Sequence, residues 1–128
     1  MSLRSPLARV LGSGSAKEGT EHWWQQRVTA AGLLVLGGWF VISLAGLGHF
    51  GRPELAAWVA KPFNATMLVL FAITLARHSS LGLQVVVEDY VHGPALKVLS
   101  LLISKFVHAF LAIAAVLAVL KISLGGMA

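Results

Sequence analysis

The chain has 128 residues, of which 57% are hydrophobic and only 12% are charged, and it contains no cysteine. A soluble globular domain carries about 25% charged residues, so this composition indicates a membrane protein. The length predicts one domain, too short to hold a flavin or iron–sulfur domain beside membrane spans. The lack of cysteine excludes disulfides, cysteine-ligated clusters and thiolate ligation of haem. Eight of the ten basic residues lie outside the apolar runs, so we relate the net charge of +5 to topology and lipid contact and predict no nucleic-acid partner.

The N-terminal part differs in composition from the rest of the chain. Residues 1–21 are rich in Ser and Gly and predict a flexible segment, and residues 22–128 form the predicted membrane domain. No apolar stretch followed by a cleavage site is present, so we predict no signal peptide. Trp23 and Trp24 follow, and tryptophan favours the headgroup level of a membrane. We interpret both as anchors, with Arg27 at the entry to the first apolar segment.

Three apolar segments follow, at residues 28–50, 63–87 and 98–120. Each exceeds 20 residues, enough to cross a hydrocarbon core of roughly 30 Å at about 1.5 Å per residue. Backbone groups in lipid must be hydrogen-bonded within the segment, so the segments are predicted to be helices. The sequence therefore predicts an all-α membrane protein with three transmembrane helices at about 28–50, 63–90 and 97–122.

Lysine and arginine are more numerous on one side of this predicted bundle. The N-terminal segment and the connection between the second and third helices carry five of them, against three on the other side. The positive-inside rule therefore favours a cytoplasmic N-terminus. The five are Arg4, Arg9, Lys17, Arg27 and Lys97, and the three are Arg52, Lys61 and Lys121.

The second apolar segment holds the residues that best indicate chemistry. A neutral imidazole at membrane depth is rare without a partner, and haem iron is a suitable partner for His78. Residues four, seven and eleven positions later share its helix face, namely Gly82, Val85 and Asp89. Gly82 leaves space beside His78 that suits a flat macrocycle or close helix packing. Tyr90 follows His78 by twelve residues, which is about 18 Å along the helix axis. The alternative interpretation of His78 is a hydrogen-bonded core histidine.

Other polar residues lie inside the apolar segments. Arg77 either faces a cofactor carboxylate or pairs with a neighbouring helix, and the sequence does not decide between the two. The third segment has a polar stripe at four-residue spacing, with Lys105 beside it. His108 of this stripe could form a bis-histidine site with His78 within one chain, or the polar residues of the stripe could hydrogen-bond to one another. The members of the stripe are Ser100, Ser104 and His108.

The run from His78 to Gly93 resembles the second transmembrane helix of a known family, the small haem-b membrane anchor of succinate dehydrogenase (respiratory complex II), usually called the D subunit. The family pattern is a histidine, a glycine four residues later, and Asp-Tyr at eleven and twelve, which are Gly82, Asp89 and Tyr90 here. Arg27-Val28-Thr29-Ala30 at the start of the first helix and three spans in a chain of this length also fit the family.

This resemblance implies that the three helices form half of a haem-binding anchor bundle. In such a complex a flavoprotein subunit oxidises succinate, an iron–sulfur subunit relays the electrons, and two anchor subunits bind haem b and ubiquinone. The resemblance makes His78 one axial ligand of the haem iron, with the other supplied by a companion cytochrome b anchor, and places Gly82 beside the haem. Arg27 is expected near the haem propionates and the quinone pocket. Tyr90, with Asp89 next to it, is expected to hydrogen-bond a quinone carbonyl oxygen.

Two alternatives stay open at this point. One is the anchor of a fumarate reductase, which runs the reaction in the opposite direction. The other is a non-redox three-helix protein in which intramembrane polar residues form an ion or proton path. Haem content distinguishes these classes. The resemblance further predicts a multi-pass protein of a bacterial cytoplasmic membrane. The residues of the hypothetical path are Arg77, His78, Lys105 and His108.

Overall fold

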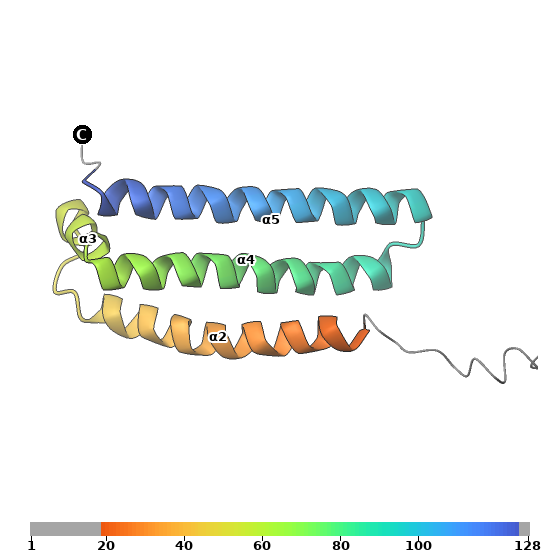
Figure 1. Cartoon of the computed structure of the whole chain (residues 1–128), viewed down its shortest axis with the longest axis horizontal. Coiled ribbons are helices and arrows are strands. Elements are labelled where there is room, and N and C mark those ends of the chain that lie inside the picture. Colours follow the sequence, from red (N-terminus) through yellow and green to blue (C-terminus); the bar gives the residue numbers. More distant parts are fainter. Residues whose placement is uncertain (1–18, 126–128) are drawn as a thin grey trace, which may run out of the picture.

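A computed structural model describes residues 19–125 of the chain. These residues form four α-helices (Figure 1). Three of them are long and apolar enough to cross a membrane, which confirms the predicted all-α membrane protein with three transmembrane helices. In chain order the helices are α2 at Gly19–Ala45, α3 at Arg52–Val59, α4 at Pro62–Tyr90 and α5 at Pro94–Ser123.

The first transmembrane helix starts earlier and ends sooner than predicted. Most of the predicted flexible segment 1–21 lies outside the described residues, but its last three residues belong to the first turn of α2. The prediction was wrong there because it began the helix at the apolar run. The polar turn before that run is helical too, and Glu21 accepts a hydrogen bond from the Gln25 side chain one turn later, at 2.9 Å. At the other end α2 stops at Ala45, five residues before the predicted end.

The other helix bounds agree closely with prediction. Helices α3, α4 and α5 each have proline at the first or second position, where the missing N–H is not needed and the fixed φ favours a helix. Pro94 therefore starts α5 three residues before the predicted position 97. The short helix α3, in the connection between the first two spans, was not predicted.

The three long helices lie side by side in one layer, with α4 in the middle (Figure 1). Within the described residues α4 packs against both α2 and α5, whereas the backbones of α2 and α5 do not approach each other. Successive long helices run antiparallel, so the start of α2 and the α4–α5 connection lie at the same end, opposite α3 (Figure 1). The exposed faces of the layer carry many large apolar side chains, for example Leu34 at 79% and Phe110 at 70% exposure. Such faces suit contact with lipid or with another membrane subunit.

An aromatic cluster holds α3 against the end of this layer. Trp58 of α3 is buried, and its indole N–H donates to Ser43 Oγ of α2 at 2.9 Å. Its ring stacks on Trp39 with centroids 5.8 Å apart. The buried Asn64 of α4 donates to the Trp58 carbonyl at 2.8 Å. These contacts from three helices fix the end of the layer opposite the α4–α5 connection.

Candidate functional site

His78 lies on the side of α4 that faces α2. It is half-buried, and its Nδ1 is 3.0 Å from the Thr29 hydroxyl oxygen on α2. It also opens into a hollow of about 360 Å³ between the two helices. Two residues predicted separately from the sequence, Arg27 and His78, therefore line one site. The full lining is His22, Trp23, Gln26, Arg27, Ala30, His78 and Val85.

The contact with Thr29 favours one tautomer of His78. The Thr29 hydroxyl oxygen lies 2.8 Å from the Gln25 carbonyl oxygen and 3.1 Å from that of Gln26. Carbonyl oxygens only accept hydrogen bonds, so all groups are satisfied when Thr29 donates to a carbonyl and accepts from the Nδ1–H of His78. In that tautomer Nε2 carries no proton, and its lone pair is available to a metal. In the sequence, Thr29 stood out only because the run Arg27–Ala30 fits the family, and no role was predicted for it.

Gly82 faces α2 one turn from His78. A methyl group built at Gly82 would lie 3.6 Å from the side-chain nitrogen of Gln26, which is ordinary van der Waals contact. Within this chain the position therefore does not require glycine. The expectation that Gly82 leaves space beside His78 for a flat macrocycle stays a prediction.

Two polar atoms beside His78 are buried without a hydrogen-bond partner among the described residues. They are Nε2 of His22 and Oε1 of Gln26, one helical turn apart on α2. Both residues line the His78 hollow. Because buried polar groups in proteins are nearly always hydrogen-bonded, these two atoms indicate a partner from outside this part of the chain.

His108 belongs to a different interface. Its Nε2 lies 3.1 Å from the Ser79 hydroxyl of α4, and its Nδ1 lies 2.7 Å from the Ser104 carbonyl oxygen. The polar stripe of α5 is thus satisfied partly within its own helix and partly by α4. His78 contacts α2 and His108 contacts the α5 side of α4, so the structure argues against a bis-histidine site within the chain.

Tyr90 and Asp89 are the last two residues of α4, and both are exposed. Tyr90 is 77% exposed, and no hydrogen bond to its hydroxyl occurs within residues 19–125. Nearby, Lys97 of α5 donates to the Glu88 carbonyl at 2.8 Å and fixes the helix end. Tyr90 follows His78 by twelve residues, about 18 Å along the axis. The structure therefore holds two separate candidate sites on one helix and does not bring Tyr90 to the His78 hollow.

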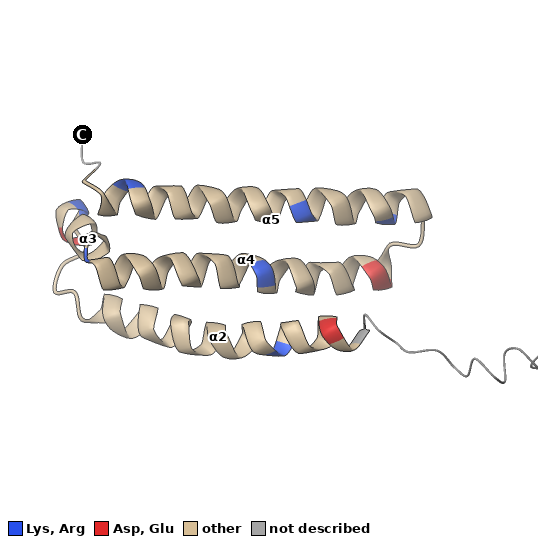
Figure 2. Ribbon diagram, viewed as in Figure 1, with Lys and Arg blue, Asp and Glu red and all other residues tan. Residues whose placement is uncertain are grey.

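Arg77 pairs with a neighbouring helix, which answers the question the sequence left open. Its guanidinium donates to the side-chain oxygen of Gln25 on α2. The charged segments lie mainly toward the helix ends, but a basic segment lies farther inside each of α4 and α5 (Figure 2). Within the described part of the chain, no group of three or more His, Cys, Asp or Glu residues could hold a metal ion. A haem iron that takes one ligand from this chain does not need such a group.

Residues 1–120 match the family described as succinate dehydrogenase/fumarate reductase transmembrane subunit. The chain belongs to this family. It is 33% identical to the succinate dehydrogenase hydrophobic membrane anchor subunit of Paracoccus denitrificans, over 96% of this chain and 95% of the relative. The protein of that name from Rickettsia bellii is 35% identical over 69% of this chain and 70% of its own length. The succinate dehydrogenase membrane anchor subunit of Reclinomonas americana is 28% identical over 71% and 78%.

Membership of the succinate dehydrogenase/fumarate reductase transmembrane subunit family confirms the resemblance found in the His78–Gly93 run. The chain is a multi-pass membrane subunit of this class of oxidoreductase complex. The family description names both succinate dehydrogenase and fumarate reductase, which run the reaction in opposite directions. The relatives are named as succinate dehydrogenase subunits, and these names favour succinate oxidation. Family membership also disfavours the non-redox ion path, in which Arg77 and His108 would have shared a role with His78.

Proposed function

We propose that the chain is the membrane anchor subunit of a succinate:quinone oxidoreductase, which binds haem b at His78 and ubiquinone at Tyr90. The observation that carries this proposal is the His78 imidazole, which lines an open hollow, has its Nδ1 against Thr29, and has no hydrogen bond at Nε2 among the described residues. A second anchor, the companion cytochrome b subunit, would supply the other axial ligand. The uncovered faces of the three-helix layer are compatible with such a companion.

The residues around His78 fit a haem. Haem supplies a one-electron carrier when it is bound. His78 would hold the iron through Nε2, and Gly82 would leave its flank open to the ring. The exposed Arg27 guanidinium, in the same hollow, would bind carboxylates of the cofactor. The unpaired atoms of His22 and Gln26 offer further hydrogen-bonding positions to the same group.

Tyr90 and Asp89 form the proposed quinone site. The free Tyr90 hydroxyl would donate to a quinone carbonyl oxygen and stabilise the negative charge that develops there on reduction. Asp89 adds a hydrogen-bond acceptor at the same helix end. We place this end on the cytoplasmic side of a bacterial inner membrane, because α2 starts there, and the sequence before α2 together with the α4–α5 connection carries the larger number of basic residues. The iron–sulfur subunit would dock at this end, with the flavoprotein beyond it.

A visible spectrum of the purified assembly tests this function directly. The assembly is isolated through a tag on this chain, and its spectrum is recorded before and after succinate is added. We expect a b-type haem signal that succinate reduces, together with a co-purifying flavoprotein. The absence of both would contradict the proposed function.

Thr29 provides a finer test of the His78 assignment. We expect Thr29→Val to weaken haem retention roughly 10- to 100-fold, because the imidazole loses the acceptor that fixes its tautomer. Thr29→Ser keeps the hydroxyl and should stay close to wild type. Haem content per complex and the electron paramagnetic resonance spectrum of the oxidised haem are the measurements. A Thr29→Val complex with normal haem content and an unchanged spectrum would remove Thr29 from the site and leave the proposed function standing.

A further inference from the structure

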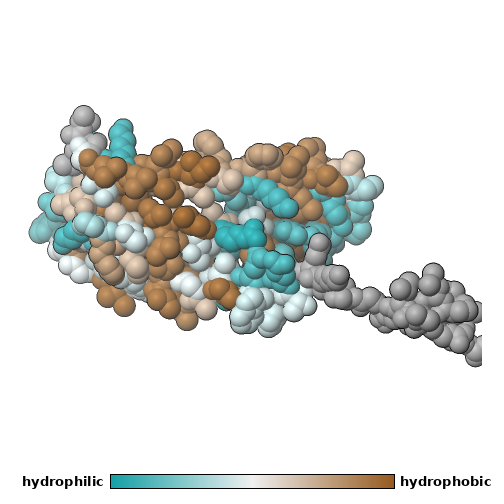
Figure 3. All heavy atoms as spheres, in the orientation of Figure 1, coloured by the Kyte–Doolittle hydropathy of each residue, from teal (hydrophilic) through white to brown (hydrophobic). Residues whose placement is uncertain are grey.

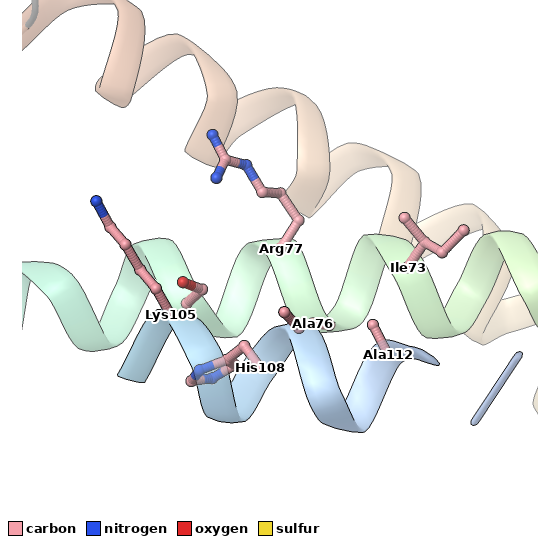
Figure 4. A pocket seen from close by; sticks show the side chains of 8 residues that line it. Ile73, Ala76, Arg77, Lys105, His108 and Ala112 are labelled. Atoms are coloured by element: carbon pink, nitrogen blue, oxygen red, sulfur yellow. The ribbon is translucent and has the colours of Figure 1, made fainter. Parts of the chain in front are cut away.

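Arg77 and Lys105 line a second hollow, which has a volume of about 350 Å³ and lies between α4 and α5 (Figure 4). Both cationic side chains are exposed, and they extend in the same direction in the view of Figure 4. Within the described residues the only hydrogen bond from Arg77 goes to the neutral amide of Gln25. The hollow therefore holds two positive charges that lack a direct ionic partner in this part of the chain. Its other polar side chains are Ser80 and His108.

The two cations lie well inside their helices and at a similar level. Arg77 is about 20 Å from the end of α4 at Tyr90, and Lys105 is about 17 Å from the start of α5 at Pro94. Exposed apolar side chains continue from both cations to the α4–α5 connection. In the other direction, apolar surface extends from the hydrophilic side chains near the middle of the molecule toward α3 (Figure 3). The apolar residues on the side of the connection are Val85, Val86, Val98, Leu99, Leu102 and Ile103.

Positive charges at such a level in membrane helices are costly unless a counter-charge covers them. The described part of the chain offers no carboxylate beside the hollow, because its carboxylates lie at helix ends. Arg77 reaches Glu21 only through the Gln25 amide, which donates to Glu21 at 2.9 Å. An anionic group from outside must therefore neutralise the hollow. The carboxylates are Glu21 in the first turn of α2, Glu54 in the first turn of α3, and Glu88 and Asp89 at the end of α4.

A cofactor in the His78 hollow cannot supply this group, because Arg77 lies on the other side of the contact between α2 and α4. Gln26 and Ala30 of α2 line the His78 hollow. Trp24 and Val28 of α2 line a different hollow together with Arg77. Positions two residues apart on a helix point in nearly opposite directions, so the two pairs mark opposite sides of α2. The counter-charge of Arg77 therefore comes from a separate partner.

The lining of the hollow suits a transmembrane helix. Alanines from both α4 and α5 line it, and small residues let the backbone of another helix approach closely. A carboxylate carried by such a helix could bind both cations and accept a hydrogen bond from the Ser80 hydroxyl. A second copy of this chain in the same orientation would have its described carboxylates at helix ends, at a different level. The lining alanines are Ala76, Ala109 and Ala112.

We propose that Arg77 and Lys105 bind an Asp or Glu side chain within a transmembrane helix of a different membrane subunit of the same complex. The apolar side chains between the cations and the α4–α5 connection separate this hollow from the level of lipid phosphates, which favours a protein carboxylate. The contact would fix the neighbouring subunit at this face of the three-helix layer. It depends on neither haem nor quinone binding.

Zero-length cross-linking tests this contact. The assembly is purified through a tag on this chain, treated with an apolar carbodiimide, digested and analysed by tandem mass spectrometry. The reagent joins the Lys105 Nζ to a carboxyl carbon as an amide and takes up the water that is lost. We expect Lys105 to be joined to an Asp or Glu inside an apolar segment of another subunit. Lys105→Arg keeps the charge but cannot form this amide, and Lys121 at the end of α5 should not link to the same residue.

Subunit content provides the second measurement. We expect Arg77→Gln/Lys105→Gln to lower the amount of the neighbouring subunit per copy of this chain roughly tenfold or more, because its carboxylate is left unpaired. Neutralising the identified carboxylate to Asn or Gln in the same complex should restore most of that subunit, since no uncompensated charge remains. The matched control is Lys61→Gln/Lys121→Gln, which removes two basic residues from the opposite end and should leave the subunit in place.

Several results would overturn the proposal. One is a set of co-purified membrane subunits without an acidic residue inside any apolar segment. Another is a Lys105 that links only to a copy of this chain, or to no subunit in a sample where other subunits are cross-linked. Wild-type subunit content in Arg77→Gln/Lys105→Gln is a third, and release of an anionic phospholipid with all subunits retained would identify a lipid instead.

If the double variant is not recovered, Lys105→Gln and Lys105→Arg replace it. Lys105→Gln should lose more of the neighbouring subunit than Lys105→Arg, because only the second keeps the charge. Equal subunit content in both variants and in the wild type would contradict the proposal.

Discussion

His78→Ala is expected to remove the haem b signal from the purified complex, lowering haem content by more than roughly tenfold, whereas His108→Ala keeps it. The physical reason is the difference between the two imidazoles. His78 lines a hollow, has its Nδ1 against Thr29, and has no hydrogen bond at Nε2 among the described residues. His108 has both ring nitrogens within hydrogen-bond distance of serine groups. The measurement is the reduced-minus-oxidised visible spectrum, normalised to the amount of this chain.

His108→Ala is the matched control, because it removes an imidazole that also lies inside a transmembrane helix. Equal haem loss in the two variants, in complexes that still contain all subunits, would contradict the assignment and favour a site that uses both histidines. Full haem content in His78→Ala would remove this residue as the ligand altogether. Co-purification of the other subunits, measured on the same samples, separates loss of a ligand from loss of assembly.

Tyr90→Phe is expected to lower quinone reductase activity by up to about 10²-fold, while succinate oxidation by an artificial dye continues at the wild-type rate. The substitution removes one hydroxyl and keeps the ring. In this chain that hydroxyl has no hydrogen bond to other described residues, and the side chain is 77% exposed, so the fold loses little. The measurement compares the two activities of one preparation.

Haem content serves as the internal control for this second variant. Tyr90 lies about 18 Å along α4 from His78, so the haem spectrum should not change. Loss of both succinate activities would indicate misassembly rather than a quinone site. Unchanged quinone reduction at saturating and limiting quinone concentrations would show that Tyr90 does not contact the quinone.

The sequence by itself determined the three membrane helices and which residues share the His78 side of α4. Apolar runs longer than 20 residues must form helices in lipid, because each backbone group needs a partner within its own segment. Once α4 is a helix, its period of 3.6 residues places Gly82 and Val85 on the side of His78, and puts Tyr90 at a fixed distance along the axis. The hollow between α2 and α4 contains Val85 and His78 as this period requires.

Only the tertiary structure decided how these helices meet. It placed α4 between α2 and α5, and it brought together residues far apart in the chain, such as Thr29 and His78 or His108 and Ser79. It also turned Arg77 toward Gln25 rather than toward the His78 hollow. Hydropathy and helical period act within one segment and carry no information on which neighbour a helix packs against. The contact between His78 and Thr29, and the separation of the two histidines, arise from that packing.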